Sequence, residues 1–266
     1  MVKIIYENIK GVPDFTSEEF HPKKTKYCIC IPIINEMGRI NVELERAQKA
    51  GVDTLADIIL CDGGSTDGST DYELLKTLGV NTLLVKTGEG KQGAQLRMGF
   101  WWALQRGYEG IITIDGNNKD SIEDVGRFVD ALENGYDFVQ GSRFVPGGKA
   151  INTPILRLLP IKLIHAPVTS FIAKYHFTDT TNAFRAHSRK YLEHPDVQPF
   201  RDVFISYELL GYLSIRASWL HLRVCEIPVT RAYPKSGKTP TKISFFRGNW
   251  NIFRILINNL FGKYNP

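Results

Sequence analysis

Residues 27–69, YCICIPIINEMGRINVELERAQKAGVDTLADIILCDGGSTDGS, decide the fold class. The stretch opens with an apolar run over 27–34, continues with a helix-patterned segment over 38–50, and reaches a second apolar run at 57–61. Strand, helix and strand in this order indicate two parallel strands joined by a crossover helix. The stretch therefore predicts the first unit of an α/β sheet.

The same alternation continues along the chain. Further strands are predicted over 81–86, 110–115 and 137–141, and further helices over 68–78, 93–106 and 121–134. This pattern predicts an α/β fold with a mostly parallel central sheet and helices on both faces. Ligands of such sheets bind beyond the carboxyl ends of the strands, so the polar residues that end each strand are the first candidates for chemistry.

The pattern changes after residue 143. A loop rich in Gly and Pro over 145–154 is followed by two apolar segments with basic residues, over 155–164 and 167–177. A polar turn over 178–182, a helix over 203–217 and a strand over 222–230 come next. We predict a loosely packed arm over 1–26, one α/β domain over 27–242 with halves 27–142 and 143–242, and a C-terminal amphipathic helix over 243–266.

Composition and charge narrow the possible classes of protein. The 266 residues are 43% hydrophobic and 23% charged, which excludes collagen-like, low-complexity and wholly disordered chains. No uninterrupted apolar run reaches the roughly 18 residues of a membrane span, and the N-terminus lacks signal-peptide features, so we expect a cytoplasmic protein. Four cysteines without CxxC spacing are expected to be reduced, buried thiols.

The net charge of +5 is unevenly distributed. Residues 1–142 hold 15 Lys and Arg against 22 Asp and Glu, a net −7, whereas residues 143–266 hold 18 against 6, a net +12. A basic C-terminal half indicates a phosphate-bearing or anionic partner, or else a solvated basic face. No nucleic-acid-binding motif accompanies the charge, so we expect no nucleic-acid partner.

Polar side chains end three of the predicted strands. Glu36, Asp62 and Asp115 each follow an apolar run directly or within a few residues. Any one of them would be ordinary turn chemistry. Together they predict one crevice in which carboxylates accept hydrogen bonds from a base and a ribose and hold a divalent cation against a diphosphate.

The strand ends resemble motifs of family 2 glycosyltransferases with a GT-A fold, in particular the dolichol-phosphate mannose synthase-like branch. PIINE resembles that branch's P-x-x-N-E, DGGSTDGS its D-D-G-S-x-D-G-T, DGN its D-x-D, GSRFVPGG its G-S-R-Y-V-P-G-G, TDTTNAFR its D-x-T-S-G-F-R, and CEIPVTR its V-E-V-P-I with a following Arg. The resemblance runs from about residue 27 to residue 243.

The resemblance implies an inverting transfer of a hexose from a nucleotide-diphosphate sugar, with Mg²⁺ or Mn²⁺ as cofactor. It assigns nucleotide-sugar binding to residues 27–142 and acceptor binding to 143–242. The implied nucleotide-sugar-binding residues are Pro32, Asn35, Glu36, Asp62, Lys91, Gln92, Asp115 and Lys119. The implied acceptor or phosphate contacts are Arg143, Arg231, Lys235 and Lys238; Asp115, Asp179 and Arg143 are the catalytic candidates, and Asp115 and Asn117 the metal ligands.

The sequence departs from the family pattern at three positions. Gly63 replaces the second Asp of the first acidic pair, Asn117 replaces the second acid of the D-x-D, and Lys119 stands where Gln is often found. We therefore expect weak or water-rich metal binding, with Lys119 supplying charge near the diphosphate. Asp120 directly precedes a helix-patterned segment and is predicted to be its N-cap.

Two interpretations of Asp179 stay open. It either positions groups or acts as a base at the sugar and acceptor, or it shapes its own loop through an Asx-turn. An ionised phosphate acceptor needs no base, whereas a hydroxyl acceptor does. The acceptor is expected to be a polyprenyl phosphate or another membrane-proximal group, with a saccharide hydroxyl in surface-polysaccharide assembly as the alternative.

Two apolar stripes flanked by basic residues lie at 155–175 and 243–264. They either pack on the core, form a homodimer interface, or lie on an anionic membrane surface, which would make the protein peripheral on the cytoplasmic face. The sequence leaves two other classes of protein open. The GEGKQG stretch at 88–93 matches a dinucleotide-binding fingerprint, and the altered D-x-D fits a non-catalytic sugar-nucleotide-binding protein.

Overall fold

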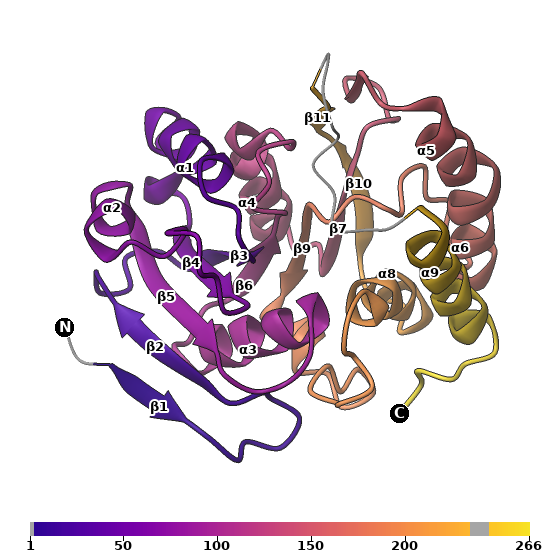
Figure 1. Ribbon diagram of the computed structural model, residues 1–266. Coiled ribbons are helices and arrows are strands. Elements are labelled where there is room, and N and C mark those ends of the chain that lie inside the picture. Colours follow the sequence, from indigo (N-terminus) through magenta and orange to yellow (C-terminus); the bar gives the residue numbers. More distant parts are fainter. Residues whose placement is uncertain (1–2, 235–244) are drawn as a thin grey trace.

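A computed structural model describes residues 3–234 and 245–266 of the chain. Its centre is a nine-stranded sheet in the order β1-β2-β5-β4-β3-β6-β9-β7-β10 (Figure 1). The strands of this sheet are β1 (Ile4–Tyr6), β2 (Phe15–Glu19), β3 (Tyr27–Ile33), β4 (Asp57–Asp62), β5 (Val80–Lys86), β6 (Gly110–Thr113), β7 (Phe138–Ser142), β9 (Arg185–Ser188) and β10 (Val224–Pro228). β8 (Lys149–Ile151) and β11 (Thr230–Ala232) form a separate parallel pair.

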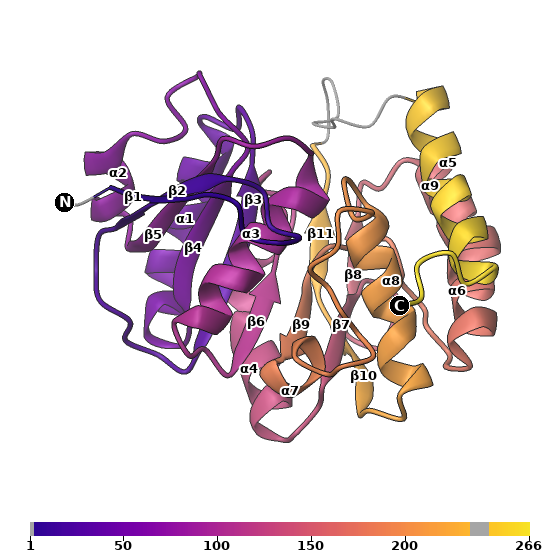
Figure 2. The same cartoon turned by 90° about the horizontal axis from the view of Figure 1, so that it is seen from below.

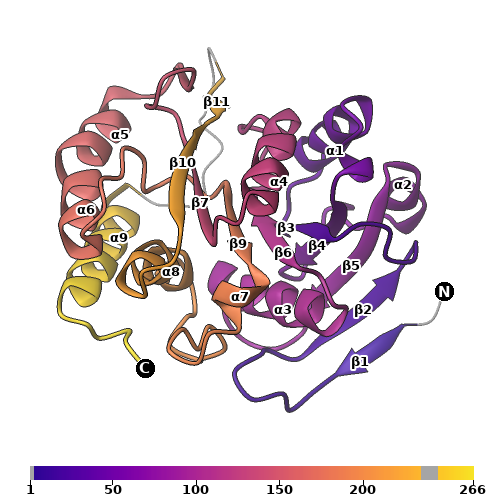
Figure 3. The same cartoon turned by 180° about the vertical axis from the view of Figure 1, so that it is seen from behind.

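The sheet is mostly parallel, as predicted. β5, β4, β3 and β6 pair in parallel, and so do β7 and β10. Only β2 and β9 run against the other strands of this nine-stranded sheet. β9 lies between β6 and β7 (Figure 3) and was not predicted, because its four residues carry no sustained apolar pattern.

Helices cover both faces of the sheet (Figure 1). Two apolar cores result, one between the sheet and α1, α2 and α4, the other between the sheet and α3, α7 and α8. The helices are α1 (Arg39–Lys49), α2 (Tyr72–Thr77), α3 (Gln92–Gln105), α4 (Val125–Glu133), α5 (Ile155–Pro160), α6 (Ala166–Ala173), α7 (Arg189–Leu192), α8 (Glu208–Trp219) and α9 (Phe245–Leu260), with short turns η1 (Val52–Thr54), η2 (Ile122–Asp124) and the π-helical η3 (Ile161–His165).

The N-terminal residues do not form the loosely packed arm that we predicted. β1 and β2 extend the edge of the sheet, and β2 pairs antiparallel with β5. Phe15 is fully buried, and its ring stacks on Tyr6 and lies edge-on to Trp101 of α3. The prediction failed because a five-residue strand beside Gly and Pro shows too little periodicity to be detected.

α5, η3 and α6 form a continuous helical run that packs beside α9, at the end of the molecule opposite β1 (Figure 2). Among the described residues, one segment is long and apolar enough to cross a membrane, Ile155–Ala173, and 22% of it is buried. The segment is not an uninterrupted apolar run, so the prediction about such runs is not contradicted, but its mean hydropathy is high enough for a membrane span. Arg157 and Lys162 interrupt the segment without making it polar overall.

Candidate active site

A cavity of about 1250 Å³ opens beyond the carboxyl ends of the central strands. β4, β3 and β6 are neighbours in the sheet, so the three predicted acidic loops meet at one edge. The predicted site residues that line the cavity are Pro32, Glu36, Lys91, Gln92, Asp115, Asn117, Lys119, Arg143 and Arg231. Asn35, Asp62 and Asp179 do not line the cavity; Asn35 is exposed, whereas Asp62 and Asp179 are buried. Lys235 and Lys238 fall outside the described residues.

The loops after β3 and β4 are bound to each other. The backbone N–H of Asn35 donates to Ser65 Oγ at 2.9 Å, and Asn35 Oδ1 accepts from the N–H of Thr66 at 2.9 Å. Asn35 has a positive φ of 49°, a conformation that Asn tolerates better than most residues. Glu36 faces the cavity, and its carboxylate accepts from Arg39 Nε at 2.5 Å. Asn35 thus holds the loop that presents Glu36.

Asp62 is buried and directed into its own loop. Its two carboxylate oxygens accept from the N–H groups of Gly64 and Ser65 and from the Ser65 hydroxyl. Next to it, Gly63 lines the cavity, and a Cβ at that position would come within 3.0 Å of Gln95 Nε2. Gln95 Nε2 bridges the carbonyls of Ile33 and Cys61 at 2.7 Å each. A base contact by Asp62 stays a prediction.

Asp115 lies between the two halves of the domain. Its carboxylate accepts from Gln92 Nε2 at 3.1 Å on one side and from Arg231 Nη2 at 3.1 Å on the other. Burial alone would raise the pKa of Asp115, but the charges of Arg231 and Lys119 outweigh it and hold the pKa below its usual value. Asp115 is therefore ionised at neutral pH, with 22% of its side chain exposed to the cavity.

The loop from Asp115 to Asp120 is held from behind by α1. Glu43, fully buried on α1, accepts the N–H of Asn118 at 2.7 Å, and Arg46 donates to Asn118 Oδ1 at 2.7 Å. Burial raises the pKa of Glu43 well above its usual value. Neither Glu43 nor Arg46 was predicted as a site residue. A charged residue in the otherwise apolar face of that helix, between Ile40 and Leu44, was the available signal.

Asp120 is not a helix N-cap. Its carboxylate is fully buried and pairs with Arg231 Nη1, and the two residues also form an isolated backbone bridge between the halves of the domain. The cap prediction failed because an ion partner 111 residues away competes for the same carboxylate. Burial raises the pKa of Asp120, although the charge of Arg231 opposes this.

Cations converge around Tyr233, which lines the cavity. Lys119 Nζ lies 5.3 Å from the centre of the Tyr233 ring, and the guanidinium carbons of Arg157 and Arg231 lie 5.8 Å and 6.0 Å from it. Burial would raise the pKa of Tyr233, but Arg231 and Lys119 outweigh it and lower the pKa. Such a cluster binds anionic groups such as phosphate.

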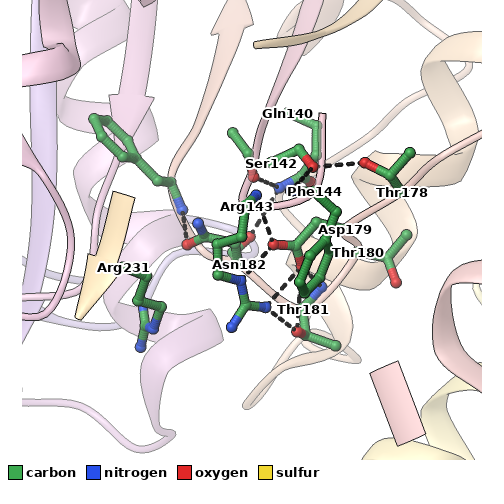
Figure 4. A network of polar contacts seen from close by, with 12 residues as sticks. Gln140, Ser142, Arg143, Phe144, Thr178, Asp179, Thr180, Thr181, Asn182 and Arg231 are labelled. Carbon is green, nitrogen blue, oxygen red and sulfur yellow. Dashed lines mark hydrogen bonds and ion pairs between the residues drawn. The ribbon is translucent and has the colours of Figure 1, made fainter. Parts of the chain in front are cut away.

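Arg143 and Asp179 form a buried ion pair (Figure 4). The carboxylate accepts from Arg143 Nε at 2.6 Å, from Nη2 at 2.8 Å and from the backbone N–H at 3.2 Å. Asp179 is fully buried and Arg143 is 3% exposed. Both oxygens of Asp179 are thus engaged by Arg143, which supports a positioning role for Asp179 over that of a base.

The glycines of the GEGKQG stretch serve packing. A Cβ on Gly93 would come within 2.6 Å of the carbonyl oxygens of Phe204 and Ser206. The carbonyl of Ile205 accepts from the N–H groups of Lys91 and Ala94, at the N-terminus of α3. A dinucleotide fingerprint needs that helix end for a pyrophosphate. The geometry therefore disfavours the nicotinamide interpretation.

The cavity continues from the cations into an apolar region between helices. Residues of the α5–η3 run, α8 and α9 line it there, namely Leu156, Pro160, Ile161, Leu210, Ile215, Ile252, Ile255 and Leu256. One cavity is thus lined by carboxylates, cations and apolar side chains.

The donor set at the D-x-D position fits a weakly held divalent cation. Asn117 Oδ1 is buried and has no hydrogen-bond partner among the described residues, while Nδ2 of the same amide donates to Asp115 Oδ2 at 3.4 Å. Mg²⁺ is commonly bound by one or two carboxylates together with waters and substrate phosphates. No group of three or more His, Cys, Asp or Glu residues in the described ranges could hold a metal without such help.

No protein-family model matches the chain. The chain is 29% identical to polyprenol monophosphomannose synthase of Mycolicibacterium smegmatis over 205 residues, which are 76% of each protein. It is 28% identical to undecaprenyl-phosphate mannosyltransferase of Micrococcus luteus over 203 residues, covering 75% of this chain and 81% of that one. It is 24% identical to dolichol-phosphate mannosyltransferase of Pyrococcus furiosus over 220 residues, covering 82% and 59%.

Solved structures share the fold. Glucosyl-3-phosphoglycerate synthase from Mycobacterium tuberculosis, in complex with Mn²⁺, uridine diphosphate and glucosyl-3-phosphoglycerate, superposes with a TM-score of 0.63. The identity is 16%, over 89% of this chain and 78% of that one.

The GT-A fold and the resemblance to the dolichol-phosphate mannose synthase-like branch are thereby confirmed. The names of the relatives also confirm the prediction of a glycosyltransferase. The roles of the individual site residues stay predictions.

Proposed function

We propose that this chain transfers a hexose from a nucleotide-diphosphate sugar to the phosphate of a polyprenyl phosphate, with inversion at the anomeric carbon. The relatives named after polyprenyl-phosphate mannosyl transfer support this acceptor class. The cavity supports it as well, since carboxylates, cations and apolar side chains all line it. A lipid phosphate presents both an anion and an apolar chain.

The hydrogen bonds between Asp179 and Arg143 are the observation that favours a phosphate acceptor over a saccharide hydroxyl. A saccharide hydroxyl must lose a proton as it attacks, whereas a phosphate is already ionised. Both oxygens of Asp179 accept hydrogen bonds from Arg143, so this residue could take up a proton only by breaking a buried ion pair. The arrangement favours the phosphate acceptor.

In the proposed reaction, an acceptor phosphate oxygen forms a bond to the anomeric carbon while the bond from that carbon to the donor diphosphate breaks. The diphosphate leaves with the bonding pair and gains negative charge. Arg231 and Lys119 lie beside Asp115 and stabilise that charge, and Arg143 binds the acceptor phosphate. A divalent cation held by Asp115 and Asn117 would add electrostatic stabilisation of the leaving group.

We also propose that the end of the molecule formed by the α5–α6 run and α9 rests on an anionic membrane surface. Leu163, Phe171 and Trp250 are about 70% exposed or more. Lys162 and Arg254 stand among these apolar side chains. Apolar side chains with interspersed cations are typical of helices at a membrane interface.

The function is tested by incubating the full chain with UDP-, GDP-, CDP- and dTDP-hexoses and undecaprenyl phosphate in phosphatidylglycerol vesicles, with Mg²⁺, with Mn²⁺ or with EDTA. Formation of a glycosylated lipid phosphate from one donor is expected, with a lower rate in EDTA. Transfer only to an added oligosaccharide would contradict the phosphate acceptor. Donor binding without transfer to any acceptor would favour the non-catalytic alternative.

The membrane contact is tested separately by co-sedimentation with phosphatidylglycerol vesicles. The double variant L163E/F171E is expected to lose sedimentation while keeping its thermal stability, because both side chains are exposed. Unchanged sedimentation together with a dimer that dissociates in this variant would identify the surface as a homodimer interface instead.

A further inference from the structure

Glu226 is a carboxylate of the CEIPVTR motif that the proposed mechanism leaves without a role. It lies on β10, the edge strand next to β7, and is partly buried. Its carboxylate accepts four hydrogen bonds from the turn at 178–179. Thr178 N donates to both oxygens at 3.0 Å and 2.9 Å, Thr178 Oγ1 donates at 2.9 Å, and Asp179 N donates at 3.1 Å.

The turn that Glu226 holds is the one that carries the partner of Arg143. The side chain of Asp179 leaves this turn toward Arg143, and Figure 4 shows Thr178 and Asp179 on the same side of the arginine. Glu226 fixes the backbone of Asp179, and Asp179 fixes the guanidinium of Arg143 at the cavity. The carboxylates of Glu226 and Asp179 thus connect the edge strand β10 to Arg143 at the cavity.

A second set of contacts ties the same turn to β7. The hydroxyls of Ser142 and Thr178 lie 2.6 Å apart, and the N–H of Phe144 donates to Ser142 Oγ at 3.0 Å. Arg143 is therefore flanked by Ser142, which contacts Thr178 of the turn, and by Phe144, which is bound to Ser142. A shift of the turn would be transmitted to the position of Arg143 from both sides.

We infer that Glu226 is a positioning residue for transfer, which acts by holding the 178–179 turn so that Asp179 orients Arg143 toward the acceptor. The inference rests on the proposed function of Arg143. A carboxylate suits the position because only an acceptor without hydrogens can receive all of these converging donors. The pairing of β10 with β7 continues over five residue pairs without this side chain, so the fold does not depend on it alone.

The test is a double-mutant cycle on the full chain with E226A, R143A and E226A/R143A. We expect E226A to lower kcat/KM for the acceptor roughly 10- to 100-fold in the otherwise unchanged chain, and by less than about 2-fold in the R143A background, because a residue that acts through another has no effect once the other is gone. Equal losses in both backgrounds would overturn the inference.

Two further variants separate positioning from simple destabilisation. Asp137 is a matched control, since its buried carboxylate accepts the N–H of Arg223 at 3.1 Å and the Ser188 hydroxyl at 2.9 Å, at the opposite end of β7. D137A is expected to lower the melting temperature with little change in kcat/KM. E226Q, which keeps one acceptor oxygen, is expected to fall between the wild type and E226A. An activity loss in D137A as large as that in E226A would assign the effect to stability.

A binding measurement keeps this inference separate from the proposed function. Farnesyl phosphate, a short prenyl phosphate, is expected to raise the melting temperature of the wild type and to do so less in E226A, while the shift with the nucleotide sugar stays the same. Absence of transfer in the wild type with this pattern intact would refute the reaction and keep the positioning role. A farnesyl phosphate shift of equal size in E226A and the wild type would refute the positioning role.

Discussion

Asp62 on the nucleotide side of the site is held differently from Arg143 and Arg231 on the acceptor side. On the nucleotide side, Asp62 accepts hydrogen bonds from residues two and three positions further along the chain. On the acceptor side, Arg143 and Arg231 are held by buried carboxylates 36 and 111 positions away. The first arrangement forms whenever its loop forms. The second exists only when the whole domain is folded.

This difference predicts which substitutions in the site lower the stability of the protein. Removing one partner of a buried ion pair leaves a charge without compensation, which costs far more than losing an exposed hydrogen bond. Substitutions of the buried ion pairs on the acceptor side should therefore lower stability and activity together. Substitutions on the nucleotide side should lower one without lowering the other. Asp115 belongs to both sides, because it contacts Gln92 and Arg231.

The largest effect is expected for D115A, which removes the carboxylate that contacts both Gln92 and Arg231. Transfer should fall roughly 10³-fold or more, because the proposed divalent cation would lose a ligand and Arg231 would lose one of its two carboxylate partners. Circular dichroism should still report a folded protein, since Asp120 continues to pair with Arg231. Near-normal transfer by D115A would refute the assignment of the site.

The next effect is expected for D179A on the acceptor side. Arg143 would remain buried without its counter-ion, so the free energy of unfolding should fall by about 3–5 kcal/mol. Urea denaturation measures this loss, and activity should fall with it. A loss below about 1 kcal/mol would mean that the two halves do not differ as described.

A smaller effect concerns pH and His187 of β9, which is buried against the rings of Phe100, Phe138 and Tyr191. Burial and the charge of Arg185 lower its pKa to about 3. Below pH 6.5 the unfolded chain takes up a proton on this residue and the folded chain does not, so stability falls as the pH drops toward 3. The loss should reach about 2 kcal/mol at pH 5.

The variant His187→Leu removes this titration. Its melting temperature should depend less on pH between 7 and 5 than that of the wild type. If the melting temperatures of the two proteins changed with pH in the same way, folding would not lower the pKa of His187.

The smallest effect is expected on the nucleotide side, at the start of α2. Asp71 is the N-cap of that helix and accepts the N–H of Leu74 at 2.9 Å. D71A should cost about 1 kcal/mol in the free energy of unfolding. Transfer should be unchanged at 25 °C, because the cap lies away from the cavity wall. A strong loss of activity in D71A would remove the contrast between the halves.

The same contrast explains what the sequence could predict. The strand–helix alternation predicted β3 to β7 and placed Glu36, Asp62 and Asp115 at one edge, because period and strand ends are local properties. The Asp120 cap was wrong, and Glu43 was missed, because each depends on a partner far along the chain. β9 is short and runs against its neighbours, so its position depends on the strands that flank it.

The Ile205 carbonyl accepts hydrogen bonds at the N-terminus of α3, so ordering of one half of the domain is coupled to ordering of the other. A nucleotide sugar that orders Lys91 should also restrict the backbone around Ile205, since the Ile205 carbonyl accepts the N–H of Lys91 at 2.9 Å. By linkage, whatever restricts this backbone tightens donor binding by the same factor. Donor binding should therefore slow amide hydrogen exchange in a segment more than 100 positions away in the sequence, and an acceptor that contacts Tyr207 or Glu208 would lower the concentration of donor required.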